Sequence, residues 1–329
     1  MSNLDAAPDE VAYTPSERPP ADIQVIDGRD VPLGGPRALT VRRTLPHRER
    51  SFVGAWCFAD HYGPANTGMD VPPHPHTGLQ TVSWLFSGEV EHRDSMGTHA
   101  LIRPGEMNLM TSGAGIAHSE VSTSSSSTLH GVQLWVALPA GDAHGPRGFQ
   151  SFATEAVDWA DAPLAKVTGG GQVRVFLGDV AGIASPVPTF SPLLGAEVTL
   201  NAGASVEWPV NPRLEHGVLV DRGPVEVGGT VVHPHDLGFV AQGRDSLRLS
   251  ALPDRPARVV LLGGEPLNDE IVMWWNFVGR SHEEIVRARD QWQAQDARFG
   301  AVAGYEGALA WLPAPELPNA RLKTRRRLP

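Results

Sequence analysis

Short strand-like runs recur along most of this chain, and turn-forming residues bound each of them. Between residues 23 and 264 the runs include ALTVRRTL, LQTVSWLF, GVQLWVAL, GAEVTLNAG and PARVVLLGG, with Gly, Pro or Asp beside them. The 35 Gly and 29 Pro residues are spread along the chain, and they favour many turns between short strands. Evenly spaced short strands are typical of β-sandwiches and β-barrels. We therefore predict an all-β fold.

A break in this texture divides the strands into two groups of similar size. The segment PAGDAHGPRG, residues 139–148, has the composition of a connection between domains. We expect two β-barrels or sandwiches in tandem, over residues 21–145 and 146–265. A flexible N-terminal arm over residues 1–20 precedes them, and a C-terminal extension over residues 266–329 follows.

The one clear helical pattern lies in this extension, in SHEEIVRARDQWQAQ at about residues 281–295. Ser281 can cap the N-terminus, and Glu284 follows three residues later, which is the spacing of a capping box. The apolar residues then fall on one helical face, formed by Ile285, Ala288 and Trp292. We predict a short amphipathic helix, and we expect the apolar run MWWNFVG just before it to pack against one of the β units.

The charge and the apolar runs bear on partners and location. A net charge of −10 and a pI of about 5.7 argue against a broad phosphate-binding surface, so we expect no direct nucleic-acid binding. No apolar run approaches the length of a membrane span, and the N-terminal residues lack the apolar core of a signal peptide. We expect no membrane association and a cytoplasmic location. The single cysteine, Cys57, cannot form a disulfide within the chain.

Two pairs of polar residues have the spacing of metal ligands on extended strands. His74 and His76 lie in HPHTGLQTV, and His118 and Glu120 lie in GIAHSEV. Residues i and i+2 of a strand share one face, so two such strands side by side would join three imidazoles and one carboxylate. That set suits Fe, Mn, Co, Ni, Cu or Zn. Spacing alone leaves open that the histidines are ordinary surface or hydrogen-bonded residues.

Four segments resemble the pirin family in their order and spacing. They are VRRTLPHRERSFVGAWCFADHYGP, HPHTGLQTVSWLFSGEVEHRDSMG, RPGEMNLMTSGAGIAHSE and HGVQLWVALP. The resemblance is strong from about residue 23 to 140, whereas the second half shares only the pattern of short strands and turns. It implies a quercetin 2,3-dioxygenase-like bicupin with a metal in the N-terminal cupin, usually iron. It also implies a ligand set of His74, His76, His118 and Glu120.

The sequence departs from the family at two positions near the HPH motif. Thr77 stands where members usually have arginine, and Gln80 stands where they usually have glutamate. In the wider cupin superfamily an acid near position 80 is a ligand, whereas in pirins the acid of the His-x-Glu motif has that role. We expect Gln80 to leave metal binding intact and to alter the groups that orient the ligands.

Two functions from different classes are compatible with such a site. The first is a metal-dependent dioxygenase that opens the ring of a flavonol-like or other small aromatic substrate, with Glu120 as the base. The second is a non-enzymatic, iron-dependent redox regulator that binds a protein partner. A structural metal that only stabilises the barrel is a third. We rank the dioxygenase, a quercetinase, first.

Other motifs carry less weight. The HPHD string at residues 233–236 has no His-x-Glu partner after it, and the nearest spare histidine is His216, so we predict no metal site there. His92 and Asp94 in EHRDSMG fit a cleft or a polar loop equally well. We expect the large aromatic residues near the motifs to be barrel core rather than substrate contacts, namely Trp56, Trp84 and Phe86.

Overall fold

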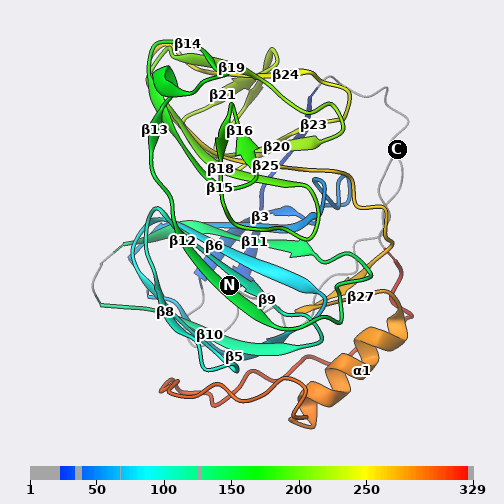
Figure 1. Ribbon diagram of the computed structural model, residues 1–329. Coiled ribbons are helices and arrows are strands. Elements are labelled where there is room, and N and C mark those ends of the chain that lie inside the picture. The colour runs from blue at the N-terminus through cyan, green and yellow to red at the C-terminus, as the bar shows by residue number, and fades with distance from the viewer. Residues whose placement is uncertain (1–22, 34–38, 67, 125–127, 325–329) are drawn as a thin grey trace.

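The computed structural model describes residues 23–33, 39–66, 68–124 and 128–324. The arm predicted over residues 1–20 lies outside the described residues. Two β units are stacked on one another, and a short helix lies at the far end of the first unit (Figure 1). The predicted all-β bicupin is confirmed. Within the described residues, no helix is both long enough and apolar enough to cross a lipid bilayer.

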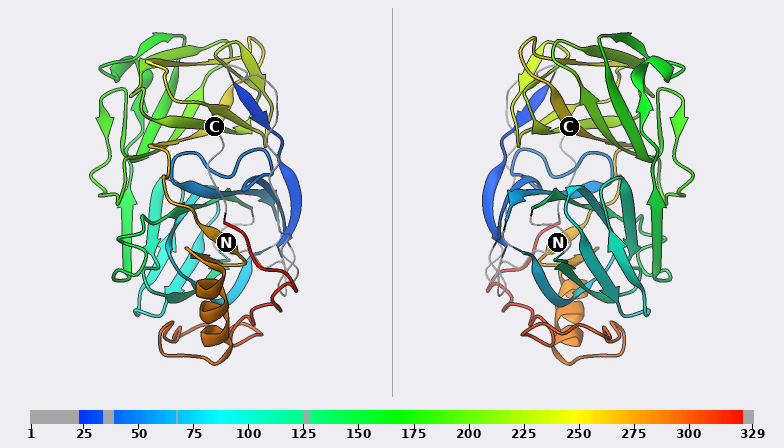
Figure 2. Two further views of the ribbon diagram at one scale, coloured as in Figure 1. Left: turned by 90° about the vertical axis from the view of Figure 1, so that its right-hand side faces the viewer. Right: turned by 90° about the vertical axis from the view of Figure 1, so that its left-hand side faces the viewer.

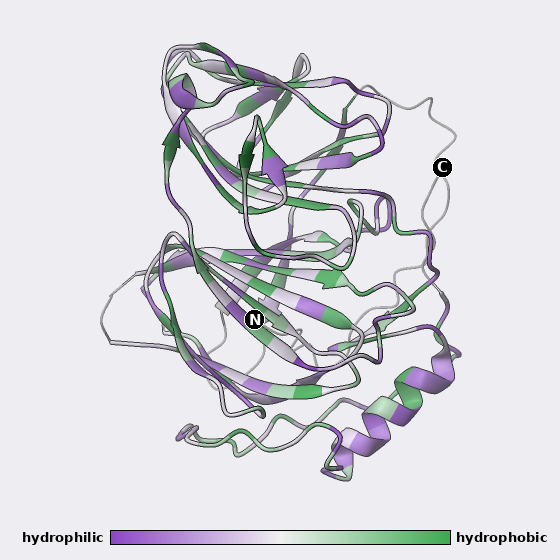
Figure 3. Cartoon of the chain, in the orientation of Figure 1, coloured by the Kyte–Doolittle hydropathy of each residue, from purple (hydrophilic) through white to green (hydrophobic). Residues whose placement is uncertain are grey.

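The first unit is a sandwich of a seven-stranded and a four-stranded antiparallel sheet. The larger has the order β12-β9-β6-β11-β4-β3-β2 and consists of β2 (Arg29–Leu33), β3 (Leu39–Leu45), β4 (Trp56–Ala65), β6 (Leu79–Ser87), β9 (Glu106–Thr111), β11 (Leu129–Ala137) and β12 (Gly148–Ala153). The smaller has the order β5-β10-β7-β8 and consists of β5 (Asp70–His76), β7 (Val90–Asp94), β8 (His99–Ile102) and β10 (Ile116–Ser122). Hydrophobic and hydrophilic residues alternate along many strands (Figure 3).

The second unit repeats this plan. Its seven-stranded sheet has the order β1-β23-β20-β25-β18-β15-β13, from β1 (Gln24–Ile26), β13 (Val157–Asp158), β15 (Gly171–Leu177), β18 (Leu193–Leu200), β20 (Glu215–Arg222), β23 (Leu237–Val240) and β25 (Ala257–Gly264). Its five-stranded sheet has the order β14-β19-β24-β21-β22, from β14 (Lys166–Thr168), β19 (Ser205–Pro209), β21 (Val225–Val227), β22 (Thr230–Val232) and β24 (Ser246–Ala251). A 3₁₀ turn, η1 (Trp159–Asp161), and a hairpin of β16 (Asp179–Val180) and β17 (Ile183–Ala184) complete the unit.

Each unit lends an edge strand to the other. The early strand β1 pairs with β23 of the second unit, with Gln24 opposite Phe239. The later strand β12 pairs with β9 of the first unit, with Gly148 opposite Thr111. The pairing of β12 with β9 therefore carries the first unit beyond the predicted boundary at residues 145/146. The Gly- and Pro-rich segment before β12 is a turn inside that unit.

The two seven-stranded sheets share an apolar core between the units. Trp56 and Trp84 from the first unit are completely buried in it, beside Phe176 from the second. The Trp84 and Phe176 rings stack at 4.8 Å, and the Trp56 indole donates to the Leu194 and Gly263 carbonyls at 3.2 and 3.0 Å. Views from two sides show the units in direct contact (Figure 2). The expectation that these tryptophans are core is confirmed.

The C-terminal extension returns to the first unit. A hairpin of β26 (Val272–Trp274) and β27 (Phe277–Gly279) lies beside β5, where the Val278 amide donates to the Thr77 carbonyl at 3.0 Å. Helix α1 (His282–Gln293) follows, and the Ser281 hydroxyl accepts from the Glu284 amide, as the capping pattern predicts. The buried face of the helix is the predicted one, Ile285, Ala288 and Trp292. This extension therefore closes one end of the sandwich that holds the HPH motif.

Candidate metal centre

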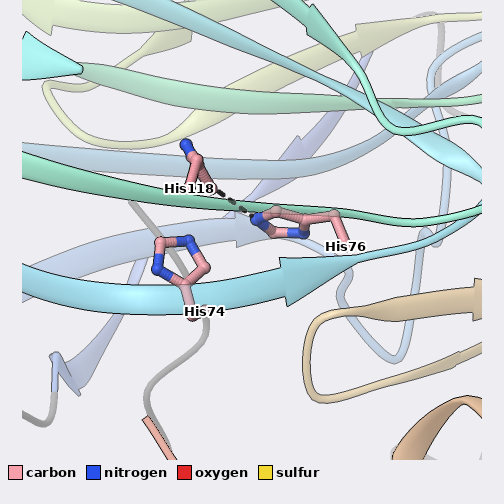
Figure 4. Close-up of side chains that lie close together, drawn as sticks. All are labelled: His74, His76 and His118. Atoms are coloured by element: carbon pink, nitrogen blue, oxygen red, sulfur yellow. Dashed lines mark hydrogen bonds between the residues drawn. The ribbon is translucent and has the colours of Figure 1, made fainter. Parts of the chain in front are cut away.

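Strands β5 and β10 place the two predicted ligand pairs opposite each other. The strands are antiparallel, with His74 opposite His118 and His76 opposite Ile116, and the register shifts between His118 and Glu120. All four side chains are at most 1% exposed. The rings of His74, His76 and His118 face one another (Figure 4), and their ligand atoms lie within 4.8 Å of each other. The alternation of the strands thus produces the expected cluster of imidazoles.

Hydrogen bonds to backbone carbonyls orient two of these rings. His74 Nδ1 lies 2.8 Å from the Pro72 carbonyl oxygen, and His76 Nδ1 lies 3.2 Å from that of Asn276, in the turn between β26 and β27. Because a carbonyl only accepts, each Nδ1 carries the proton and each Nε2 presents a lone pair. His76 Nε2 lies 3.1 Å from His118 Nε2. Histidines that bind a metal typically donate their other ring N–H to a carbonyl or carboxylate in this way, which fixes the ring and its tautomer.

Burial also keeps the rings neutral. It lowers the pKa of His74 and of His118 well below the usual range, and neighbouring imidazoles lower both further. Burial lowers the pKa of His76 to about 3. A neutral imidazole is the form that binds a metal, so no protons need to leave these ring nitrogens near neutral pH. The three residues fit a divalent transition metal, and a buried carboxylate lies beside them.

That carboxylate, Glu120, is held by groups from the larger sheet. Ser83 Oγ on β6 lies 3.2 Å from Glu120 Oε1 and 2.9 Å from Gln133 Oε1 on β11. Since a hydroxyl carries one proton, Ser83 donates to Glu120 when the Gln133 amide nitrogen is turned toward Ser83. Glu120 is also near enough to His74 to act on the pKa of that ring. The sequence reasoning did not identify Ser83 or Gln133.

A second group of ligand atoms shares His118 with the first. It consists of His92, His118 and Glu120. His92 Nδ1 lies 3.3 Å from His118 Nδ1, and His92 Nε2 lies 3.5 Å from Asp94 Oδ2. Burial alone would raise the pKa of Asp94, but hydrogen bonds from His92 and Thr98 lower it. Sequence reasoning left His92 and Asp94 unassigned, although they repeat the i, i+2 spacing of the other two pairs.

The two departures from the family motif lie outside these ligand groups. The Thr77 hydroxyl donates to the Val278 carbonyl at 3.3 Å, which helps to fix the C-terminal hairpin. The Gln80 amide donates to Thr111 Oγ1 at 2.9 Å and is buried. Their contacts place Thr77 against the extension and Gln80 within the larger sheet.

The histidines of the HPHD string and His216 belong to none of the candidate ligand groups in the described part of the chain. His233, the first histidine of the string, is exposed. A third group does lie elsewhere, between the two units, and it consists of His61, His130 and Asp221. The sequence reasoning missed it because its members come from three strands that are far apart along the chain.

Comparisons with known proteins agree with this architecture. The pirin family model matches residues 38–136, and the model of the pirin C-terminal cupin domain matches residues 195–300. A Pseudomonas aeruginosa protein named "Putative quercetin 2,3-dioxygenase" is 41% identical over 300 residues, which cover 90% of this chain and 91% of that protein. A pirin-like protein of Caulobacter vibrioides is 36% identical over 279 residues, 82% of this chain and 92% of that protein.

A solved structure shows the same fold. The crystal structure of quercetin 2,3-dioxygenase from Acinetobacter baumannii superimposes with a TM-score of 0.82 at 34% identity, covering 92% of this chain and 97% of that one. The match therefore extends over both β units, and the second half resembles the family more closely than the sequence reasoning expected, because the pirin C-terminal cupin model matches residues 195–300. Together, the two matching family models and these near full-length similarities show that the chain is a member of the pirin family.

Proposed function

We propose that the chain is a metal-dependent dioxygenase of the quercetin 2,3-dioxygenase type, acting on a flavonol-like or other aromatic substrate. In this proposal His74, His76, His118 and Glu120 hold one Fe(II) ion. The observation that carries it is the convergence of three buried, neutral imidazoles beside a buried carboxylate. The names of the Pseudomonas and Acinetobacter relatives support the reaction type.

The chemistry expected of the ion is that of an open transition-metal site. When bound, a divalent ion would supply Lewis acidity, and a redox-active ion such as Fe(II) would also be able to exchange electrons with dioxygen. Three nitrogen ligands and one oxygen ligand suit iron, and they leave positions free on an ion that prefers six. Manganese, cobalt, nickel, copper and zinc accept the same donor set.

We assign Glu120 as the general base that takes the proton of the substrate hydroxyl. Ser83, backed by Gln133, holds one of its oxygens and thereby fixes the direction of the carboxylate. The nearby phenol of Tyr62 does not compete for this role. Burial raises the pKa of Tyr62 well above its usual range, and the charge of Glu120 adds to that effect. Tyr62 therefore stays protonated.

The test is an oxygen-dependent assay on protein loaded anaerobically with Fe(II). Quercetin and air are added, and flavonol absorbance and oxygen uptake are followed together. In the wild type we expect the flavonol absorbance to fall as oxygen is consumed. In the Glu120→Ala variant we expect neither change. Replacing the exposed residue Glu306 by Ala supplies a matched control that should keep full activity.

Metal content separates the possible failures. We expect His76→Ala and Glu120→Ala to lose the iron of this centre while keeping the fold by circular dichroism. Full iron occupancy in both variants would show that the ligand set is wrong. A wild type that holds iron at this centre but consumes neither flavonol nor oxygen would refute the dioxygenase and favour an iron-dependent regulator.

A further inference from the structure

A second buried group of metal-ligating side chains lies between the two β units. We call His61, His130 and Asp221 the interdomain cluster. His61 lies on β4 and His130 on β11 of the first unit, whereas Asp221 lies on β20 of the second. His61 Nε2 and His130 Nε2 each lie 2.6 Å from the same oxygen, Asp221 Oδ1. The two Nε2 atoms are 3.3 Å apart.

The surroundings fix all three side chains. His61 is 1% exposed, Asp221 4% and His130 9%. Arg258 Nε lies 2.6 Å from Asp221 Oδ2, so the other carboxylate oxygen is left facing the two imidazoles. A carboxylate that binds a metal is typically held by a hydrogen bond of this kind to its other oxygen. The Phe86 and His130 ring centres are 4.9 Å apart, and the Arg258 guanidinium lies over the Phe86 ring, 4.1 Å from its centre.

We propose that the interdomain cluster is a second metal site, which binds a divalent transition-metal ion such as Zn²⁺ through His61, His130 and Asp221. In a tetrahedral zinc site with bonds of about 2.0–2.1 Å, neighbouring ligand atoms are about 3.3 Å apart. The two imidazole nitrogens already have that spacing. Each Asp–His separation has to widen by roughly 0.7 Å to match it, and side-chain rotation provides such a change. The fourth position is left to a water molecule or to a further side chain.

The charges allow a cation to enter. The guanidinium of Arg258, whose Nε lies 2.6 Å from Asp221 Oδ2, favours the ionised form of this carboxylate, which is the form that binds a cation. Arg258 binds the other oxygen, Oδ2, and Glu197 is a second acid within electrostatic reach of Arg258. Two carboxyl groups thus offset part of the charge of the arginine and the ion.

The position indicates what the ion does. Its ligands come from both β units, so an ion that binds only when the units are docked stabilises the docked state by mass action. None of its ligands belongs to the centre formed by His74, His76 and His118. The two sites should therefore fill and empty independently.

Metal counting on four proteins tests this site. Each protein is stripped with a chelator, reloaded with Zn²⁺ and desalted, and the metal per chain is measured by mass spectrometry. We expect about two ions in the wild type, about one in either His76→Ala or Asp221→Asn, and about none in the double variant. Loading with Co²⁺ instead gives each site its own visible absorption, which identifies the site that is lost.

His130→Gln provides the control for folding. Its amide can still donate to Asp221, so the contact between the units is kept while the imidazole ligand is lost. We expect this variant to remain folded and to lose the second ion, and we expect a chelator to lower the melting temperature of His76→Ala but not of His76→Ala/His130→Gln. A folded His76→Ala that binds no metal, or a His130→Gln that still binds both ions, would overturn the proposal.

Discussion

Replacing Asp94 by Asn tests whether His118 is prepared for metal through His92. Asp94 Oδ1 accepts from the Met96 and Thr98 amides at 2.8 and 3.0 Å. Asp94 Oδ2 faces His92 Nε2 at 3.5 Å. In the Asp94→Asn variant the remaining carbonyl oxygen can keep the two backbone contacts, so the new amide nitrogen faces His92.

This change reverses the direction of the hydrogen bonds. An amide nitrogen only donates, so His92 Nε2 must accept and His92 Nδ1 must carry the proton. His92 Nδ1 lies 3.3 Å from His118 Nδ1, which then has to accept. The proton of His118 moves to Nε2, the atom that faces His76. A protonated Nε2 has no lone pair for an ion.

The structure also indicates how much metal affinity the Asp94→Asn variant should lose. Removing a group that hydrogen-bonds to a metal ligand typically lowers the metal affinity by roughly 10–100-fold. The His92–Asp94 contact is long at 3.5 Å, so we expect a loss near the lower end, about tenfold or about 1.4 kcal/mol.

The assay is a titration of Co²⁺ against a competing chelator. All variants carry Asp221→Asn as well, so that the interdomain cluster does not contribute. Glu91→Gln is the matched control, because Glu91 lies on the same strand but pairs with Arg93 and His99 on its other face. If the Asp94→Asn variant is folded and its affinity for Co²⁺ is within about twofold of that of its parent, Asp94 does not set the protonation of His118 through His92.

Three further predictions concern stability. Burial lowers the pKa of His216 to about 4 from 6.5, so the unfolded chain binds the extra proton between these values and stability falls with falling pH there. The free energy of unfolding of the wild type is therefore lower at pH 4 than at pH 7. His216→Leu should reduce this difference by up to about 3 kcal/mol, as measured by urea unfolding at the two pH values. Trp84→Phe removes the indole hydrogen bond to Glu197 at 2.8 Å and should lower the free energy of unfolding by about 1.5–3 kcal/mol, measured against wild type at pH 7. Ser281→Ala removes the cap on the Glu284 amide and should cost about 1 kcal/mol in the same measurement, whereas Ser281→Asp should not.

Local patterns made much of the fold and part of the site predictable. A strand repeats every two residues, so HPH and His-x-Glu show which side chains share a face before any pairing is known. The same holds for the helix, where Ser281 and Glu284 lie on one turn. Once the strands are extended, only their side-by-side placement has to be inferred, and β5 and β10 do pair.

Contacts between distant segments could not be read in this way. The carbonyl that orients His76 belongs to Asn276, 200 residues later, and no periodicity links the two. The members of the interdomain cluster, His61, His130 and Asp221, meet only after both sheets have formed and stacked. Ser83 is a different case, because a serine on an alternating strand has no local signal that separates a core hydroxyl from a ligand support.

The exchange of edge strands also limits how this protein can be divided. A fragment ending at residue 145 would lack β12, so the edge of β9 would be left unpaired, and the fragment would carry β1 without its partner β23. Open strand edges of this kind recruit other chains and aggregate. Expressing the two halves separately, divided at the apparent linker, would therefore yield two aggregation-prone fragments. Fragments that keep their strand pairs have to include β1 with the second half and β12 with the first.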